Sequence, residues 1–174
     1  MARLRKFASY RRLERPYTRT SKYKEKSFVR MSPNIRILGF EFGSSKKRFP
    51  YTLKLISKNS LQIRDNALES AKQTSNKLLE TSLGLSSYHL KVKAYPHHVL
   101  RENPLASGAG ADRFSTGMQK SFGKPLGNAA QIRKGDAIFN ISVDKNNIEL
   151  AKQALARASK KLPCSYTIEV VANK

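Results

Sequence analysis

The stretch that decides the fold is residues 137–170, which run AIFNISVDKNNIELAKQALARASKKLPCSYTIEV. Its first part alternates apolar and polar residues, which predicts a half-buried strand with Ala137, Phe139, Ile141 and Val143 inside. Its middle repeats apolar residues at helical spacing from 148 to 162, after a capping Asp144 or Asn147 and before Pro163. Its last part alternates again, at Tyr166, Ile168 and Val170. The stretch therefore predicts strand, helix and strand in that order.

The sequence upstream predicts a second helix and further strands. The helix runs from Asn66 to Leu83, with Asp65 as its cap and Gly84 at its end. Strands are predicted at 51–55, at 88–94 and, bent around Gly39, at 35–42; a hairpin is predicted to join 130–132 to 137–143. The order lacks regular βαβ repetition. It predicts a single α+β domain with both helices packed on a mixed or mainly antiparallel sheet.

The charge of the chain excludes most ordinary soluble enzymes. There are 34 Lys and Arg against 12 Asp and Glu in 174 residues, a net charge of +22. A large net charge opposes compaction and favours binding to polyanions. Residues 1–58 hold 17 basic and 3 acidic residues, so +14 of the +22 lies in the first third. The counter-charge is expected to come from a nucleic acid.

Residues 1–33 are predicted to be a basic N-terminal arm that binds RNA, ahead of an α+β domain at 34–174. Aromatic residues lie between its basic ones without a helical or strand period, which suits stacking on bases beside neutralised phosphates. A solubilising tail is the alternative. The candidate contacts in the arm are Arg3, Arg5, Tyr10, Arg11, Arg12, Arg15, Tyr17, Arg19, Lys22 and Lys24. The basic turn Lys46, Lys47 and Arg48 and the outward-facing Lys91 and Lys93 are further candidates.

A glycine-rich insertion at about residues 103–127 interrupts the domain. It fits no nucleotide-binding fingerprint, because Arg113 occupies the third glycine position and Pro125 the place of the P-loop hydroxyl. The single Cys164 and three histidines fit no disulfide or standard zinc set. No catalytic group, metal or cofactor is predicted. The first residues lack the apolar run of a secretory signal, so the protein is expected to stay inside the cell.

Three segments resemble one family closely: REN at 101–103, GAGADRFSTGM at 108–118 and FGKPLG at 122–127. They are similar to the archaeal and eukaryotic L10e family of large-subunit ribosomal proteins, the counterpart of bacterial L16p. The likeness also includes RKGD at 133–136, KKLP at 160–163 and the early RR at 11–12 and PYTR at 16–19. It therefore spans nearly the whole chain.

The resemblance implies a structural, non-enzymatic constituent of the large ribosomal subunit with an α+β fold of the hammerhead type. It implies binding to large-subunit rRNA near the central protuberance, including the 5S rRNA region, and contacts with neighbouring ribosomal proteins, in the cytoplasm. It also implies that the loop supports aminoacyl-tRNA in the A site, next to the peptidyl transferase region. The loop residues concerned are Arg101, Asn103, Gly108, Gly110, Asp112, Arg113, Gly117, Lys120, Gly123 and Lys124. No membrane contact and no homo-oligomer are expected.

Two alternatives from other classes remain at this point. One is an RNA-associated enzyme with a nucleotide-binding glycine-rich loop, which requires saturable nucleotide binding. The other is a DNA-architectural protein, for which the charge suffices but no groove-entry motif is visible. Within the loop, Asp112 is expected to cap a short helix that begins at Arg113.

Overall fold

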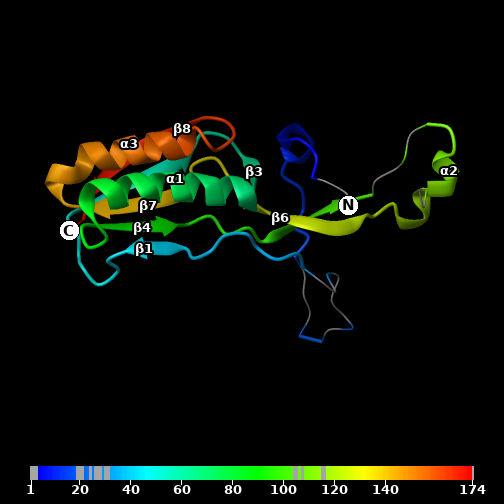
Figure 1. Cartoon of the computed structure of the whole chain (residues 1–174), viewed down its shortest axis with the longest axis horizontal. Helices are drawn as coiled ribbons and strands as arrows, with labels where there is room; N and C mark the ends of the chain where they lie inside the picture. Colours follow the sequence, from blue (N-terminus) through cyan, green and yellow to red (C-terminus); the bar gives the residue numbers. More distant parts are fainter. Residues whose placement is uncertain are drawn as a thin grey trace.

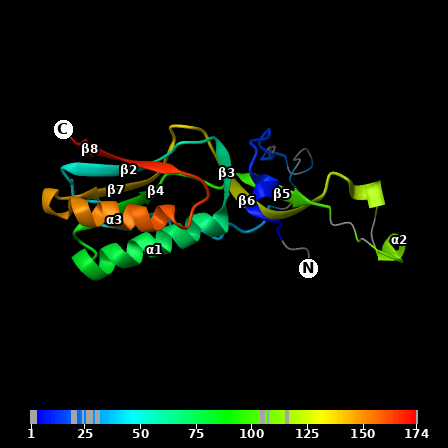
Figure 2. The ribbon, with the colours of Figure 1, turned by 90° about the horizontal axis from the view of Figure 1, so that it is seen from above.

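The computed structural model describes residues 4–18, 22–23, 25, 29, 32–103, 106, 108–114 and 117–173. Two antiparallel sheets lie one after the other along the molecule, with two helices on the larger one (Figures 1 and 2). The strands are β1 (Glu41–Gly43), β2 (Tyr51–Ser57), β3 (Leu61–Arg64), β4 (Tyr88–Val92), β5 (His98–Glu102), β6 (Lys124–Ile132), β7 (Ala137–Val143) and β8 (Tyr166–Ala172). The helices are α1 (Asp65–Leu83), α2 (Ala111–Phe114) and α3 (Ile148–Ser159), with short 3-10 turns at Phe7–Tyr10, Gly117–Lys120 and Lys145–Asn147.

The larger sheet, sheet A, has the strand order β1-β4-β7-β2-β8, and all its pairs are antiparallel. Alternation places apolar residues in rows across it: Leu53 of β2 pairs with Ile141 of β7, which pairs with Leu90 of β4. All three are fully buried. A single apolar face therefore runs across the central strands.

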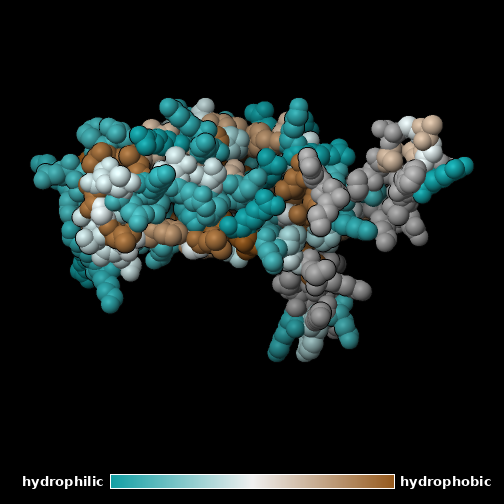
Figure 3. Space-filling view, in the orientation of Figure 1, coloured by the Kyte–Doolittle hydropathy of each residue, from teal (hydrophilic) through white to brown (hydrophobic). Residues whose placement is uncertain are grey.

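Helices α1 and α3 cover this apolar face and pack against each other. The buried residues of α3 are Ala151, Ala154, Leu155 and Ala158, and those of α1 include Ala71 and Ser75. Small side chains allow the helix axes to approach closely, and the helical period keeps them on one side. The predicted α+β arrangement of two helices on an antiparallel sheet is confirmed. On the face shown in Figure 3, hydrophilic residues cover much of the surface, with smaller apolar patches between them.

The smaller sheet, sheet B, has the order β3-β6-β5 and extends away from the helices toward the glycine-rich loop (Figure 1). The predicted hairpin is therefore wrong. β6 pairs with β3 and β5, and β7 pairs with β2 and β4, so the turn at Lys134–Asp136 passes the chain from one sheet to the other. The sequence showed two neighbouring strands but not that they join different sheets.

Three other local expectations need correction. Residues 35–40 do not form a strand, because the backbone amides of Arg36 and Leu38 donate to Asp65 and Glu69 of α1 instead of to a sheet. Asp65 is the first residue of α1 rather than its cap, and its Oδ1 accepts the amide of Asn66. Similarly, α2 begins at Ala111, so Asp112 lies inside this helix. The end of α1 at Gly84 is confirmed, with φ of 74° and an amide that donates to Glu80.

Candidate nucleic-acid interface

The N-terminal segment 4–18 is fixed to sheet B through its own backbone. The Tyr17 amide donates to Nδ1 of His98 at 2.9 Å, and the Val99 amide donates to the Tyr17 carbonyl at 3.3 Å. Side chains from the other two strands hold further carbonyls: Gln131 binds that of Glu14 at 2.9 Å, and Gln62 binds that of Arg12. At these four points the segment is thus anchored through its backbone, without the side chains of Arg11, Arg12 and Arg15.

Three arginines of this segment therefore remain available to an anion. Arg11, Arg12 and Arg15 are exposed and, within the part of the chain that the structure describes, form no ion pair. Lys22 is also exposed, whereas Arg3, Arg19 and Lys24 lie outside the described residues. Three unpaired guanidinium groups in five residues suit phosphate neutralisation.

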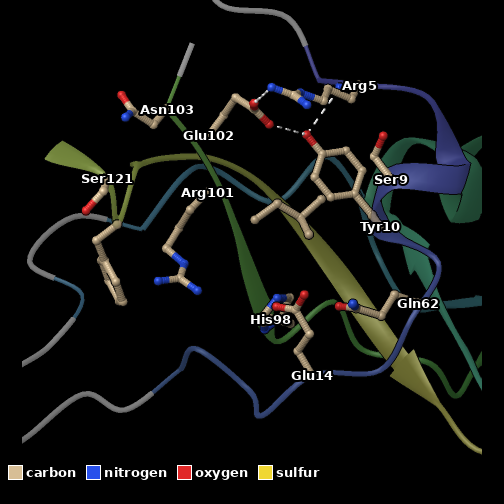
Figure 4. A pocket seen from close by; sticks show the side chains of 12 residues that line it. Arg5, Ser9, Tyr10, Glu14, Gln62, His98, Arg101, Glu102, Asn103 and Ser121 are labelled. Atoms are coloured by element: carbon tan, nitrogen blue, oxygen red, sulfur yellow. Dashed lines mark hydrogen bonds and ion pairs between the residues drawn. The ribbon is translucent and has the colours of Figure 1, made fainter. Parts of the chain in front are cut away.

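Glu102 at the end of β5 organises the beginning of the segment (Figure 4). Its two carboxylate oxygens accept from Arg5 at 2.6 Å and from the Tyr10 hydroxyl at 3.1 Å. Burial raises the pKa of the Tyr10 hydroxyl above its ordinary value, and the neighbouring Glu102 carboxylate raises it further, although the Arg5 amide opposes this. Tyr10 therefore stays protonated and continues to donate to Glu102.

A polar pocket of about 360 Å³ lies between the segment and sheet B. His98 forms part of its wall and is 3% exposed; burial lowers the pKa of the imidazole, so the neutral form is favoured. Because Nδ1 accepts the Tyr17 amide, the hydrogen-bond pattern assigns the ring proton to Nε2. The other lining residues are Arg5, Ser9, Tyr10, Glu14, Gln62, Leu100, Arg101, Glu102, Asn103, Ser121 and Phe122.

Arg101 and Phe122 line one side of this pocket and form a cation–aromatic cluster with Tyr17. The guanidinium carbon of Arg101 lies 4.4 Å from the ring centre of Tyr17 and 3.8 Å from that of Phe122. The two rings meet edge to face, with centres 5.2 Å apart. Arg101 thus joins the N-terminal segment to the base of the loop by cation–π contacts.

Close backbone contacts fix the base of the loop. Gly123 has a φ of 82°, and a Cβ at this position would lie 3.0 Å from the carbonyl carbon of Glu102, so only glycine fits without displacement. The Asn103 side chain donates to the Gly117 carbonyl at 3.2 Å. Gly108, Gly110 and Gly117 also have positive φ, and Arg113 and Lys124 are exposed. The side chains of Asp112 and Lys120 lie outside the described residues.

The other basic candidates lie along sheet A. Lys46, Lys47 and Arg48 are exposed between β1 and β2, at the end of sheet A that points away from sheet B (Figure 1). Lys47 pairs with Asp144 at 2.9 Å. Lys91 pairs with Glu41, and Lys93 is exposed. The basic turn Lys46, Lys47 and Arg48 is therefore separate in the fold from the candidates in segment 4–18.

Sequence reasoning missed the residues that hold the segment in place. β3 and β5 were not predicted, so the anchoring roles of Gln62, His98 and Glu102 were not visible; nor was the ring of Phe122 singled out. The only signals were the apolar pair Val99 and Leu100 beside His98, and an aromatic residue directly before Gly123.

Neither a metal site nor a membrane-spanning helix occurs among the described residues. They contain no group of three or more His, Cys, Asp or Glu side chains placed to hold a metal ion. None of their helices is long and apolar enough to cross a bilayer.

The chain is similar in sequence to several known proteins. Residues 13–169 match the family Ribosomal protein L16p/L10e. A large ribosomal subunit protein uL16 of Archaeoglobus fulgidus is 44% identical over 161 residues, covering 92% of this chain and 89% of that protein. The uL16 protein of Methanococcus maripaludis is 40% identical over 171 residues, covering 98% and 96%, and that of Staphylothermus marinus is 42% identical over 148 residues, covering 85% and 82%.

The fold and the site together define a strongly basic α+β protein in which an N-terminal segment with three exposed arginines packs on a small antiparallel sheet. The chain belongs to the ribosomal protein family L16p/L10e. The predicted family is confirmed, and membership in a family of structural ribosomal proteins decides against both the enzyme and the DNA-architectural alternatives.

Proposed function

We propose that this protein is a structural constituent of the large ribosomal subunit in the cytoplasm, where segment 4–18 and sheet B bind rRNA. Its family and its relatives support the subunit assignment. The single observation that carries the binding surface is the anchoring of segment 4–18 by backbone hydrogen bonds, which leaves Arg11, Arg12 and Arg15 exposed. Rigid presentation of cations reduces the entropy lost when phosphates bind.

The glycine-rich loop has a separate role in the proposal. It supports aminoacyl-tRNA in the A site, while rRNA near the central protuberance and the 5S rRNA region holds the body of the protein. Support comes from the loop's position at the far end of sheet B, its positive-φ glycines and its exposed Arg113. Glycines permit close approach of the backbone to RNA.

Sedimentation of large ribosomal subunits tests the proposed binding of rRNA by segment 4–18. Arg11→Ala with Arg12→Ala is expected to reduce the fraction of protein that migrates with large subunits, increasingly as salt is raised. Arg157→Ala with Lys160→Ala removes the same charge from exposed positions at the end of α3 and is expected to have a smaller effect. Equal losses for both pairs would contradict a specific role of segment 4–18.

Deletion of residues 105–111 tests the loop. We expect the shortened protein to join large subunits normally, because segment 4–18 and sheet B are untouched, and to reduce aminoacyl-tRNA binding to the A site. Loss of subunit incorporation would show that the loop itself is needed for docking.

A further inference from the structure

Phe122 at the base of the loop is apolar and solvent-exposed, and yet its ring is held in place. The residue is 62% exposed. One face of its ring is covered by the Arg101 guanidinium at 3.8 Å, and Tyr17 contacts it at 5.2 Å between ring centres. Its large exposed area therefore includes the face opposite Arg101.

The backbone on both sides of Phe122 is constrained. Gly123 packs directly on the backbone of Glu102, and the Ser121 amide donates to the Met118 carbonyl at 3.1 Å. The ring is thus oriented before any partner arrives. A preorganised aromatic ring loses little entropy when a flat partner stacks on it.

The chemistry around this ring points to a nucleobase. Apart from Tyr17 and the exposed Met118, its described neighbours are polar or cationic: Ser121 and Lys124 are exposed, and Arg101 lies beneath the ring. A protein partner would require a larger apolar patch, whereas an unpaired nucleotide offers a flat π-face together with a phosphate for the surrounding cations.

We propose that the exposed face of Phe122 stacks an unpaired base of large-subunit rRNA, with Arg101 and Tyr17 as the support beneath it. The inference rests on the proposed rRNA-binding function and gives it a specific contact. The base belongs to rRNA rather than tRNA because the cluster is built partly from Tyr17 of segment 4–18 and lies where the loop joins sheet B, not at its far end.

The test is nucleotide-resolved acylation of rRNA 2′-hydroxyls in purified large subunits without tRNA, which reports local flexibility. With Phe122→Leu, one unpaired nucleotide is expected to become severalfold more reactive, because leucine keeps an apolar contact but removes the ring. Phe122→Tyr is expected to preserve the protection. Tyr95→Leu removes a ring that is 53% exposed and packed on Phe40, and it should leave that nucleotide unchanged.

The outcomes separate this proposal from the general function. Normal incorporation of Phe122→Leu without any reactive nucleotide would overturn the stacking contact and leave the subunit assignment intact. A protection that appears only after tRNA is added would overturn the assignment to rRNA. A short-wave ultraviolet cross-link from Phe122 to a neighbouring protein instead of RNA would also overturn it. Failure of the unaltered protein to sediment with large subunits would refute the proposed function itself.

Discussion

Lys72 shows how a single residue connects the segment before β1 to the helix layer. This lysine of α1 is 3% exposed, and its Nζ contacts Glu69 at 2.6 Å and the Leu38 carbonyl at 2.7 Å. It also lies 4.8 Å from the ring centre of Phe42. A buried cation with these partners is satisfied, but removing the lysine leaves the Leu38 carbonyl without this donor and Glu69 without its cation.

Lys72→Met is therefore expected to lower the free energy of unfolding by about 3 kcal/mol, since truncating a buried ion pair is costly even when the replacement is apolar. Urea denaturation of the purified protein measures this loss. Adding Glu69→Gln should recover about 1 kcal/mol, because the unpaired charge is then gone. Additive losses in the double variant would show that the two side chains do not interact.

His98 makes the docking of segment 4–18 depend on pH. Its pKa is lowered first by burial and then by His97 and Arg101, against the opposing effect of Glu14. As the pH falls, the imidazole of the unfolded or undocked chain therefore takes up its proton first, near its ordinary pKa of 6.5. The stabilisation is complete above that pH and is lost as the pH falls toward the lower folded pKa.

We expect the Tyr17 amide to lose hydrogen-exchange protection as the pH drops below about 6.5, because protonated Nδ1 no longer accepts it. Protection factors in the isolated protein, corrected for the intrinsic pH dependence of exchange, measure the effect. His98→Gln should abolish the pH dependence, and the Leu53 amide in β2 serves as a reference. Unchanged protection of Tyr17 across this range would contradict the assigned acceptor.

At the scale of elements, Gly43 decides whether β1 can pair with β4. It pairs with His89, has a φ of 84°, and a Cβ there would lie 2.2 Å from the Tyr88 carbonyl oxygen. Gly84 at the end of α1 has a similar φ of 74° but nothing within 4 Å of such a Cβ. Alanine variants at these two positions therefore distinguish the cost of backbone strain alone from the cost of strain combined with a steric clash.

Gly84→Ala is expected to cost about 1–3 kcal/mol of folding free energy, the strain of a positive-φ extended backbone that glycine alone adopts easily. Gly43→Ala should cost roughly twice that or more, because β1 must also move away from β4. Urea denaturation gives both values, and exchange of the amides in β1 shows whether its pairing is lost. Equal costs would mean that the Tyr88 carbonyl moves aside easily.

The elements also show what the sequence could predict. Helices α1 and α3 and strands β2, β4, β7 and β8 could be predicted from clear apolar periods, and these elements form the main core. β3 has only four residues, and β5 has no alternating pattern, since His98, Val99 and Leu100 are buried in succession. The basic candidates were visible as charges, but their anchors depend on strand pairing between distant residues, which no local pattern encodes.

At the scale of the whole molecule, two groups of three exposed cations are separated by the length of sheet A. Arg11, Arg12 and Arg15 belong to the segment that is anchored on sheet B, and Lys46, Lys47 and Arg48 lie at the opposite end of sheet A. Binding at both places would let one small protein connect separate segments of RNA, with affinity dominated by released counterions.

Replacing either group of three by alanine is expected to reduce the salt dependence of binding to protein-depleted large subunits. Each lost phosphate contact lowers the slope of log K against log salt by about 0.7–0.9. The Arg11, Arg12 and Arg15 variant should lose about 2–3 units, and the Lys46, Lys47 and Arg48 variant less, because Lys47 is already paired with Asp144. A group whose removal leaves the slope unchanged does not contact phosphate.

The strand order of sheet A also determines when the nascent chain can fold. β2 lies between β7 and β8, its partners in antiparallel pairing, and these begin at Ala137 and Tyr166. The 79 residues from 58 to 136 are therefore synthesised between β2 and the first of its partners. Until β8 has emerged, Leu53 and Leu55 belong to an unfinished core, so sheet A can be completed only after residue 172 has been synthesised.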